Sequence, residues 1–250
     1  MEINTLVTSL ADRLQEALGG KVEGLYLYGS LACGDFDPGV SDVDMLAVLG
    51  DGVTDEELAW LREMHRRFAD ENPEWAGRIE VQYVAREALR TFRERPSTIA
   101  NISPGEPLHF IEAGPDWLMN WYFVLDHGVT LFGPPPSKFI PPISNEEFVA
   151  DARAMAVENY GKWAERNLDC KAQSYVCLTM CRALYTSRTG KHASKKKAAR
   201  WFTAEFPEWS ALIERAFEWR SAPDLTHINP ATTMPETRRF IRFVLTQIAE

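Results

Sequence analysis

Residues 28–49 read YGSLACGDFDPGVSDVDMLAVL, and this stretch carries the most specific pattern in the chain. A short apolar run ends at Tyr28, Gly29-Ser30 follows, and eleven residues later comes Asp42-Val43-Asp44. Two carboxylates at positions i and i+2 of a strand point to the same face. They repel each other there, and a divalent cation with oxygen ligands is the usual counter-charge. The glycine and the hydroxyl before them suit the close approach of an anion.

A third acid stands on another predicted strand. Residues 78–85, RIEVQYVA, alternate in polarity, and Val81 and Tyr83 share the face opposite to Glu80. A carboxylate on an otherwise apolar strand is costly unless it is paired or bound to a metal. Three acids around a metal pair are typical of metal-assisted phosphoryl or nucleotidyl transfer. The D-x-D motif alone is common. The prediction therefore depends on its combination with Gly29-Ser30, the eleven-residue gap and the acid on a later strand.

The remaining pattern predicts two domains. The first half shows helical spacing at 5–18, 54–70 and 116–127, strands at 24–28, 42–49, 78–85 and 130–132, and an irregular stretch at 96–114. Five prolines between Pro134 and Pro142 then interrupt regular structure. After them we expect helices alone, at 145–167, 174–187, 194–206, 209–219 and 235–249. The predicted fold class is therefore α+β, with a mixed-sheet domain over 1–140 and an all-helical bundle over 141–250.

Composition narrows the class of protein. The 250 residues are 45% hydrophobic and 25% charged, which excludes a disordered or collagen-like chain. No apolar run approaches the roughly 18 residues of a membrane span, and the acidic amphipathic start predicts no signal peptide. The four cysteines form no C-x-x-C pair, and Cys177 and Cys181 fit a helix core, so we expect reduced thiols and a cytoplasmic protein.

The net charge of −9 is divided unevenly. Residues 1–140 carry 11 basic and 23 acidic side chains, whereas residues 141–250 carry 16 basic and 13 acidic ones. An acidic half suits a metal ion or a cationic substrate. Because a duplex-binding surface needs a more basic stripe, we expect no nucleic-acid partner.

The quoted motif resembles the G-S…D-x-D signature of the DNA polymerase β-type nucleotidyltransferase superfamily. Two later segments, DWLMNWYFVLDHGVTLFGPPP at 116–136 and LTMCRALYTSRTGKHASKKKAARWF at 178–202, resemble the aminoglycoside 3''-adenylyltransferases. The resemblance covers nearly the whole chain. It implies transfer of AMP from ATP to a hydroxyl of an aminoglycoside or aminocyclitol, spectinomycin or streptomycin, with release of pyrophosphate.

The resemblance also implies roles in the first domain. Asp42 and Asp44 would hold two Mg²⁺ ions that bridge the ATP phosphates. Glu80 would take the proton of the attacking hydroxyl and also ligate metal, which makes these three acids the predicted catalytic set. The remaining predicted nucleotide contacts of this domain are Gly29, Ser30, Ser41 and Asp116. For Asp116 the alternative is a helix N-cap before Trp117.

In the second domain, Arg182 matches a phosphate-binding arginine and Lys195 an ATP-contacting lysine. Ser194 has the character of an N-cap, so Lys195 would lie in the first helical turn, where a cation opposes the helix dipole unless an anion binds. The alternative is a solvated lysine run. By the resemblance, this domain closes the site over the nucleotide.

The acceptor side is less defined. Trp163 matches a substrate-contacting tryptophan, while the family's substrate aspartate falls on Leu168 with Asp169 one step away. Trp121 and His127 are interpreted as packing residues. We expect a monomer that acts on a small molecule, with no membrane partner. The alternatives are another small-molecule acceptor, AMPylation of a protein, or nucleotide binding without catalysis.

Overall fold

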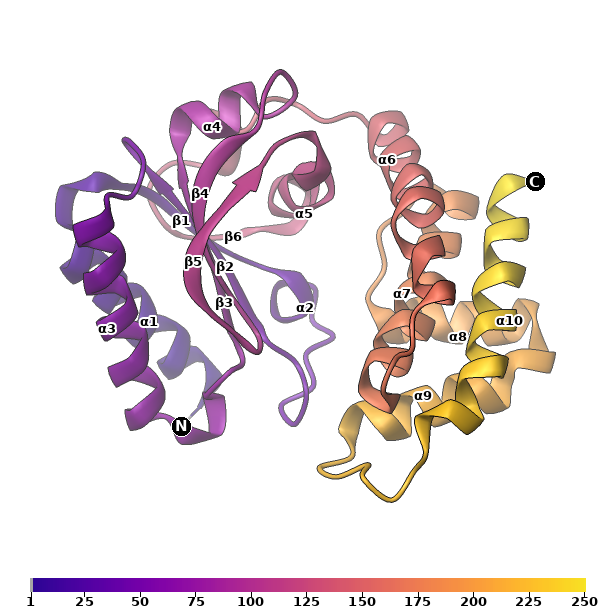
Figure 1. The fold of residues 1–250 in the computed structure, drawn as a ribbon. Coiled ribbons are helices and arrows are strands. Elements are labelled where there is room, and N and C mark those ends of the chain that lie inside the picture. Colours follow the sequence, from indigo (N-terminus) through magenta and orange to yellow (C-terminus); the bar gives the residue numbers. More distant parts are fainter. Residues whose placement is uncertain (1) are drawn as a thin grey trace. The chain divides into compact units, whose positions relative to one another are not determined.

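The computed structural model describes residues 2–250, which form two compact units (Figure 1). The first, here called the sheet unit, ends at Ile143, and the helical unit runs from Ser144 to Glu250. The division lies slightly later than the predicted one at 140/141, and Ile143 packs against a core of the sheet unit. The proline-rich segment is also tied to that unit, since Tyr26 Oη donates to the carbonyl of Pro134 at 2.6 Å.

A six-stranded sheet in the order β5-β4-β3-β2-β1-β6 forms the centre of the sheet unit. β2 and β3 pair in parallel, and the other neighbours pair antiparallel. The strands are β1 (Val22–Tyr28), β2 (Val43–Leu49), β3 (Ile79–Ala85), β4 (Ser97–Ser103), β5 (Glu106–Ala113) and β6 (Val129–Phe132). The strands predicted at 24–28, 42–49, 78–85 and 130–132 are thus confirmed as β1, β2, β3 and β6.

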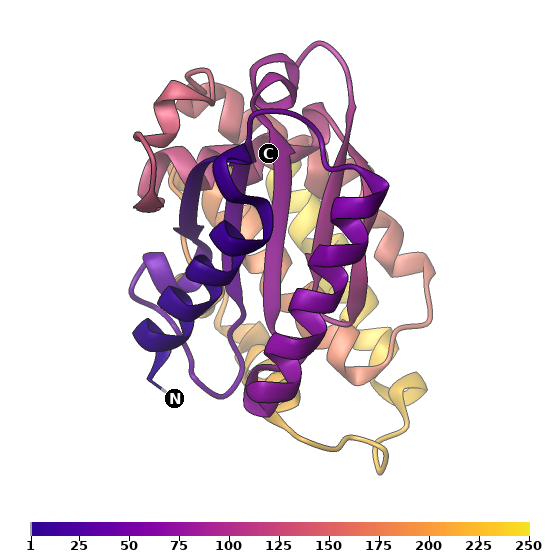
Figure 2. The same cartoon turned by 90° about the vertical axis from the view of Figure 1, so that its left-hand side faces the viewer.

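Helices cover both faces of this sheet. α1 (Ile3–Leu18) and α3 (Asp55–Glu71) lie side by side on one face, as Figure 2 shows, and bury an apolar stripe against it. α3 begins with a capping box, in which Thr54 and Glu57 satisfy each other's backbone N–H groups. α5 (Leu118–His127) packs against the opposite face. The short helices α2 (Gly29–Ala32) and α4 (Arg86–Thr91) follow β1 and β3.

The stretch predicted to be irregular, 96–114, is a β-hairpin instead. Pro104 and Gly105 form the turn between β4 and β5. Pro107 lies inside β5, and β5 is the edge strand. An edge strand tolerates proline because one side of its backbone needs no hydrogen-bond partner. The prediction of irregular structure was therefore wrong, because the prolines at the turn and on the edge strand do not prevent the two strands from pairing.

The helical unit surrounds one buried helix, α7 (Cys170–Thr189), whose neighbours come from all parts of the unit. The other helices are α6 (Asn145–Glu158), α8 (Lys195–Glu205), α9 (Ser210–Ser221) and α10 (Pro230–Ala249). α10 begins earlier than predicted: Asn229 caps it, and Pro235 lies inside it. Cys177 and Cys181 are fully buried in α7, as expected. The predicted α+β class is confirmed.

Candidate active site

The predicted acids lie where the two central strands begin. Asp44 in β2 pairs in parallel with Glu80 in β3, and Tyr28 at the end of β1 pairs with Asp44 from the other side. Paired residues project from the same face of a sheet. Val81, by contrast, belongs to the core under α1 and α3, as the alternation predicted. The structure therefore brings the carboxylates of Asp44 and Glu80 and the ring of Tyr28 to one face.

Asp42 adjoins this pair in the chain, and Asp42, Asp44 and Glu80 together are called the acidic row. Asp42 comes directly before β2, two residues from Asp44, and the N–H of Val43 between them donates to the carbonyl of Arg78 at 2.9 Å. All three acidic residues are half-buried. Neighbouring strands are about 4.8 Å apart, and two ionised carboxylates at such a separation favour a bound cation or a shared proton.

The pKa of the Tyr28 hydroxyl depends on its burial and on the nearby acids. Burial, followed by the negative charges of Glu80 and Asp44, raises the pKa of the Tyr28 hydroxyl well above its ordinary value. The hydroxyl therefore keeps its proton at neutral pH and acts as a hydrogen-bond donor. It donates to Oε1 of Gln82 at 2.6 Å. The sequence analysis assigned no role to Tyr28 or Gln82.

Gly29 stands directly behind the Asp44 carboxylate. Its φ is +71°, and an added Cβ would lie 2.0 Å from Asp44 Oδ2. The sequence suggested that this glycine lets an anion approach, and the structure adds a second reason for it, since a side chain here would displace the carboxylate. Ser30 follows in α2, where it is half-buried.

The loop before Asp42 is held by Arg78. Its guanidinium donates to the carbonyls of Ser41 and Pro38, at 3.1 Å from Nε and 2.8 Å from Nη2 respectively, and lies 4.3 Å from the ring centre of Trp75. The Ser41 hydroxyl is buried and accepts from the N–H of Asp37 at 3.0 Å. Ser41, a predicted nucleotide contact, thus also shapes the loop that leads into the acids.

Asp116 lies in the 3-10 turn Pro115–Trp117 before α5 and is exposed. Its Oδ1 accepts from the N–H of Gly114 at 3.0 Å. The helix-cap interpretation is wrong, because the N-cap positions of this turn and of α5 are Gly114 and Trp117. Trp121, one turn into α5, is buried, as predicted for a packing residue.

In the helical unit, Ser194 caps α8, with its Oγ accepting from the N–H of Lys197 at 3.1 Å. Lys195 is therefore the first residue of the helix, as predicted, and it is half-buried rather than fully solvated. Its Nζ lies 4.2 Å from the ring centre of Tyr175. A lysine over an aromatic face gains a cation–π contact that offsets part of its unfavourable place in the helix dipole.

Trp163 belongs to the same aromatic cluster. It stacks on Tyr160 at 4.4 Å between ring centres and meets Tyr175 edge-on at 5.8 Å. Burial raises the pKa of Tyr160, and the positive charge of Arg182 lowers it in part, which places Arg182 beside the cluster. Three residues predicted to bind substrates, Trp163, Arg182 and Lys195, thus lie around Tyr160 and Tyr175. The sequence analysis assigned no role to these two tyrosines. The i, i+7 spacing of Tyr175 and Arg182 was the available signal.

Asp169, the predicted acceptor contact, has a structural role as well. It is the N-cap of α7, and its Oδ1 accepts from the N–H of Ala172 at 2.8 Å. Leu168 packs against the core of the helical unit. The carboxylate one residue after the family's aspartate position thus caps the central helix of its unit.

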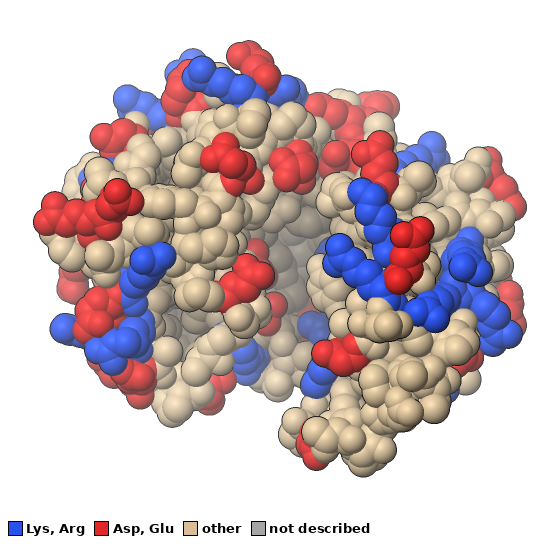
Figure 3. All heavy atoms as spheres, in the orientation of Figure 1, with Lys and Arg blue, Asp and Glu red and all other residues tan. Residues whose placement is uncertain are grey.

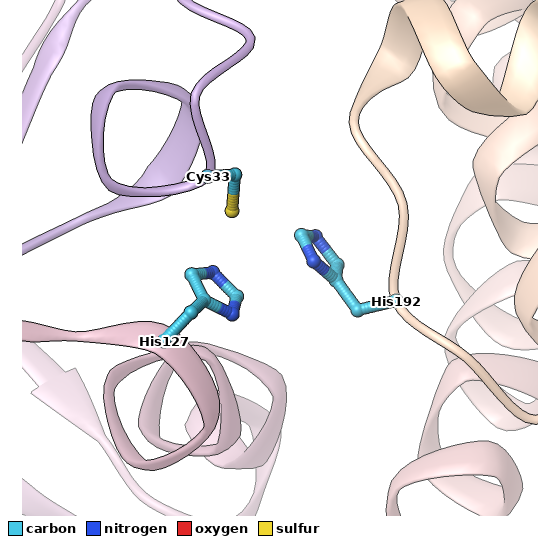
Figure 4. Close-up of side chains that lie close together, drawn as sticks. All are labelled: Cys33, His127 and His192. Atoms are coloured by element: carbon cyan, nitrogen blue, oxygen red, sulfur yellow. The ribbon is translucent and has the colours of Figure 1, made fainter.

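A sulfur and an imidazole meet near the end of α5 (Figure 4). Cys33 follows α2, His127 ends α5, and their Sγ and ring-nitrogen atoms lie within 4.8 Å of each other. His192, also labelled there, belongs to the helical unit. Two ligands within one unit are fewer than the three or four of a zinc site, so we assign no metal to this pair.

Comparison with known families connects the two halves. Residues 7–101 match the nucleotidyltransferase domain, and residues 138–247 match the C-terminal domain of aminoglycoside adenylyltransferases. The chain belongs to the aminoglycoside adenylyltransferase family. The first match contains Gly29, Asp42, Asp44 and Glu80, and the second contains Trp163, Arg182 and Lys195.

A solved relative within this family's fold is spectinomycin adenyltransferase AAD(9) from Enterococcus faecialis, determined with ATP and spectinomycin. It matches with a TM-score of 0.77 and 16% sequence identity, over 99% of both chains. At this identity the likeness concerns the fold. Comparison with curated protein sequences gave no match. Among the described residues, no helix combines the length and apolar character needed to cross a bilayer.

The acidic row fits the magnesium ions expected of the nucleotidyltransferase domain. Mg²⁺ prefers carboxylate oxygens and binds through one or two carboxylates together with substrate phosphates. Asp44 and Glu80 supply such oxygens from adjacent strands, and Asp42 stands one alternation earlier. The chemistry of the donor set therefore agrees with the predicted ion.

Proposed function

We propose that the protein transfers AMP from ATP to a hydroxyl of an aminoglycoside or aminocyclitol and releases pyrophosphate. The observation that carries this proposal is the cross-strand pair Asp44–Glu80 in a nucleotidyltransferase domain, joined to a C-terminal domain of the aminoglycoside adenylyltransferase type. The relative crystallised with ATP and spectinomycin supports both substrates as candidates.

In this proposal, the carboxylates of Asp42 and Asp44 hold two magnesium ions, with Glu80 as a further ligand. When bound, the metal neutralises charge on the phosphates. Glu80 also accepts the proton of the acceptor hydroxyl, for which it must come within hydrogen-bond reach of that group. The family's third acid thus has two tasks.

The nucleotide contacts are proposed from both units. Gly29, Ser30 and Ser41 adjoin the acidic row. Asp116 is proposed to contact ATP, and Arg182 and Lys195 are proposed to bind its phosphates as cations. Each of these assignments is open to substitution by alanine with ATP affinity as the measurement.

The acceptor is proposed to be cationic. The sheet unit carries 23 acidic against 11 basic side chains, which attracts polycations over a distance of about the Debye length. Trp163, stacked on Tyr160, is the proposed aromatic contact, and Asp169 the proposed acidic one. We further propose that the protein is cytoplasmic, because three of its cysteines are buried thiols and ATP is its proposed co-substrate. We also propose that it is a monomer, which size-exclusion chromatography would check.

The test is pyrophosphate release from ATP and magnesium across a panel of aminoglycosides and aminocyclitols. Spectinomycin and streptomycin head the panel, and mass spectrometry identifies the AMP ester. Asp44→Asn, which removes a charged metal ligand, should abolish release while the far-UV spectrum stays unchanged. Absence of any ester with the wild-type enzyme, or full activity of Asp44→Asn, would contradict the proposal.

A further inference from the structure

A buried glutamine lies beside the candidate base. Gln82 is fully buried in β3, two residues after Glu80 and on the same face. Its Nε2 donates to Oε1 of Glu80 at 2.9 Å and lies 3.2 Å from Oδ1 of Asn101, the paired residue of β4. Its Oε1 accepts from the Tyr28 hydroxyl. Three strands thus hold one side-chain amide.

The orientation of that amide is fixed by its partners. The amide oxygen of Asn101 only accepts hydrogen bonds, so Gln82 must present its NH₂ group to Asn101 and to Glu80. Its carbonyl oxygen then faces Tyr28, whose hydroxyl donates to it at 2.6 Å. Both N–H groups and the oxygen of Gln82 are used, and a flipped amide would set oxygen against oxygen.

The partners are themselves anchored. Asn101 donates through Nδ2 to Oγ of Ser103 at 2.8 Å, which leaves its oxygen directed at Gln82. Tyr28 also forms a side-chain hydrogen bond with Asn120 of α5. A fully satisfied buried network is rigid, because each displaced group would lose its partner out of reach of water. The Gln82 amide is therefore held from both sides of β3, and it in turn holds one oxygen of the Glu80 carboxylate.

We propose that Gln82, locked by Tyr28, is a positioning residue that sets the rotamer of Glu80 for the transfer reaction. The inference rests on the proposed function. Gln82 touches neither nucleotide nor acceptor in this role and acts only through the carboxylate. Removing such a supporting hydrogen bond typically costs about 10- to 100-fold in activity, and the loss belongs in turnover rather than in ATP affinity.

The test uses two variants and a matched control. Gln82→Met keeps the length of the side chain without its donors, and Tyr28→Phe removes the hydroxyl that locks the amide. The control is Tyr83→Phe. Tyr83 follows Gln82 in β3 and is as buried as Tyr28. Its hydroxyl lies 2.6 Å from His65 Nε2 on the opposite face of the sheet. Single-turnover rates and calorimetric ATP affinities are measured for each protein.

We expect Gln82→Met to lower the single-turnover rate about 10- to 100-fold, Tyr28→Phe to lower it less, and Tyr83→Phe to leave it unchanged. ATP affinity should stay within about twofold in all three. In a Glu80→Gln background, Gln82→Met should cause no further loss, since both changes act on one group. If Gln82→Met does not fold, the pair Tyr28→Phe and Tyr83→Phe decides.

Three results would overturn the inference. They are an unchanged rate in both Gln82→Met and Tyr28→Phe, an equal loss in Tyr28→Phe and Tyr83→Phe, and an undiminished effect of Gln82→Met without Glu80. These presuppose an active wild type. A wild-type enzyme that makes no AMP ester at all overturns the proposed function, and this inference with it.

Discussion

Two glycines after β1 have nearly the same positive φ angle in different surroundings. Gly29 and Gly34 have φ values of +71° and +70°. A Cβ at Gly29 would lie 2.0 Å from Asp44 Oδ2, whereas one at Gly34 would meet nothing within 4 Å. The two positions therefore separate the cost of a left-handed backbone from the displacement of a carboxylate.

Alanine at both positions should destabilise the fold by a similar amount, about 1–2 kcal/mol, because L-residues disfavour positive φ. Gly29→Ala should in addition lower AMP transfer by about 100-fold, the typical effect of a misplacement near 1 Å in an active site. Gly34→Ala should keep its activity. Urea unfolding and initial rates provide the measurements. Equal activity of the two variants would show that the Asp44 carboxylate tolerates displacement.

At single residues, the sequence predicted which side chains belong to the site better than it predicted their hydrogen-bond partners. The spacing of Asp42 and Asp44 and the cap at Ser194 are local patterns, and local patterns can be interpreted without a structure. The bond between Tyr28 and Gln82 joins residues of β1 and β3. It depends on the register of three strands, and one slip of register would turn a side chain to the other face.

Among the elements, the loop between α2 and β2 has a defined anchor. Arg78 holds two of its carbonyls and stacks on Trp75. The planar guanidinium is suited to both contacts, whereas an ammonium group supplies a point charge that cannot reproduce the fork. The anchor matters because the loop ends at Asp42.

Arg78→Lys should therefore loosen the segment 35–41 and lower AMP transfer, while the charge of the chain is unchanged. Hydrogen exchange followed by mass spectrometry should show faster exchange in that segment. The control is Arg86→Lys, which alters an exposed ion pair with Glu23 at 2.6 Å and should change neither quantity, as exposed pairs contribute little. Unaltered exchange in Arg78→Lys would remove the anchoring role.

Two elements were predicted wrongly, and both contain proline. The stretch 96–114 was predicted to be irregular, and the last helix was predicted to begin at Pro235. The structure places Pro107 on an edge strand and Pro235 within a helix that Asn229 had already started. Proline excludes one backbone hydrogen bond, and whether that bond is needed depends on which neighbours surround the element. The helices and central strands, with long periodic patterns, were predictable.

Across the whole molecule, the two units differ in charge and in the composition of their cores. The helical unit carries 16 basic and 13 acidic residues, and Figure 3 shows basic side chains over part of its surface as well as on the sheet unit. The sheet unit, by contrast, is strongly acidic and buries a histidine. His65 of α3 lies against Tyr83 of β3 in the core under α1 and α3. Low pH should therefore reduce the stability of the sheet unit through protonation of His65.

Burial lowers the pKa of His65 from 6.5 to about 4, because the charged imidazolium would lose its hydration. The unfolded chain then binds one more proton than the folded chain between pH 6.5 and pH 4. The free energy of unfolding is therefore not reduced by His65 above pH 6.5, and it falls as the pH drops through this window. The total amounts to about 3 kcal/mol once the pH is below 4.

His65→Gln keeps a hydrogen-bonding partner for Tyr83 without the titration. Between pH 7 and pH 4.5 the wild-type sheet unit should lose about 2 kcal/mol more stability than this variant, the difference that the shifted pKa implies over that range. Peptides from β3 and α7, followed by hydrogen exchange in urea, report on the two units separately. The α7 peptides should respond to acid equally in both proteins, because Tyr83 and its partner belong to the other unit. Parallel pH profiles of the β3 peptides in wild type and variant would show that His65 takes up its proton without unfolding the core around it.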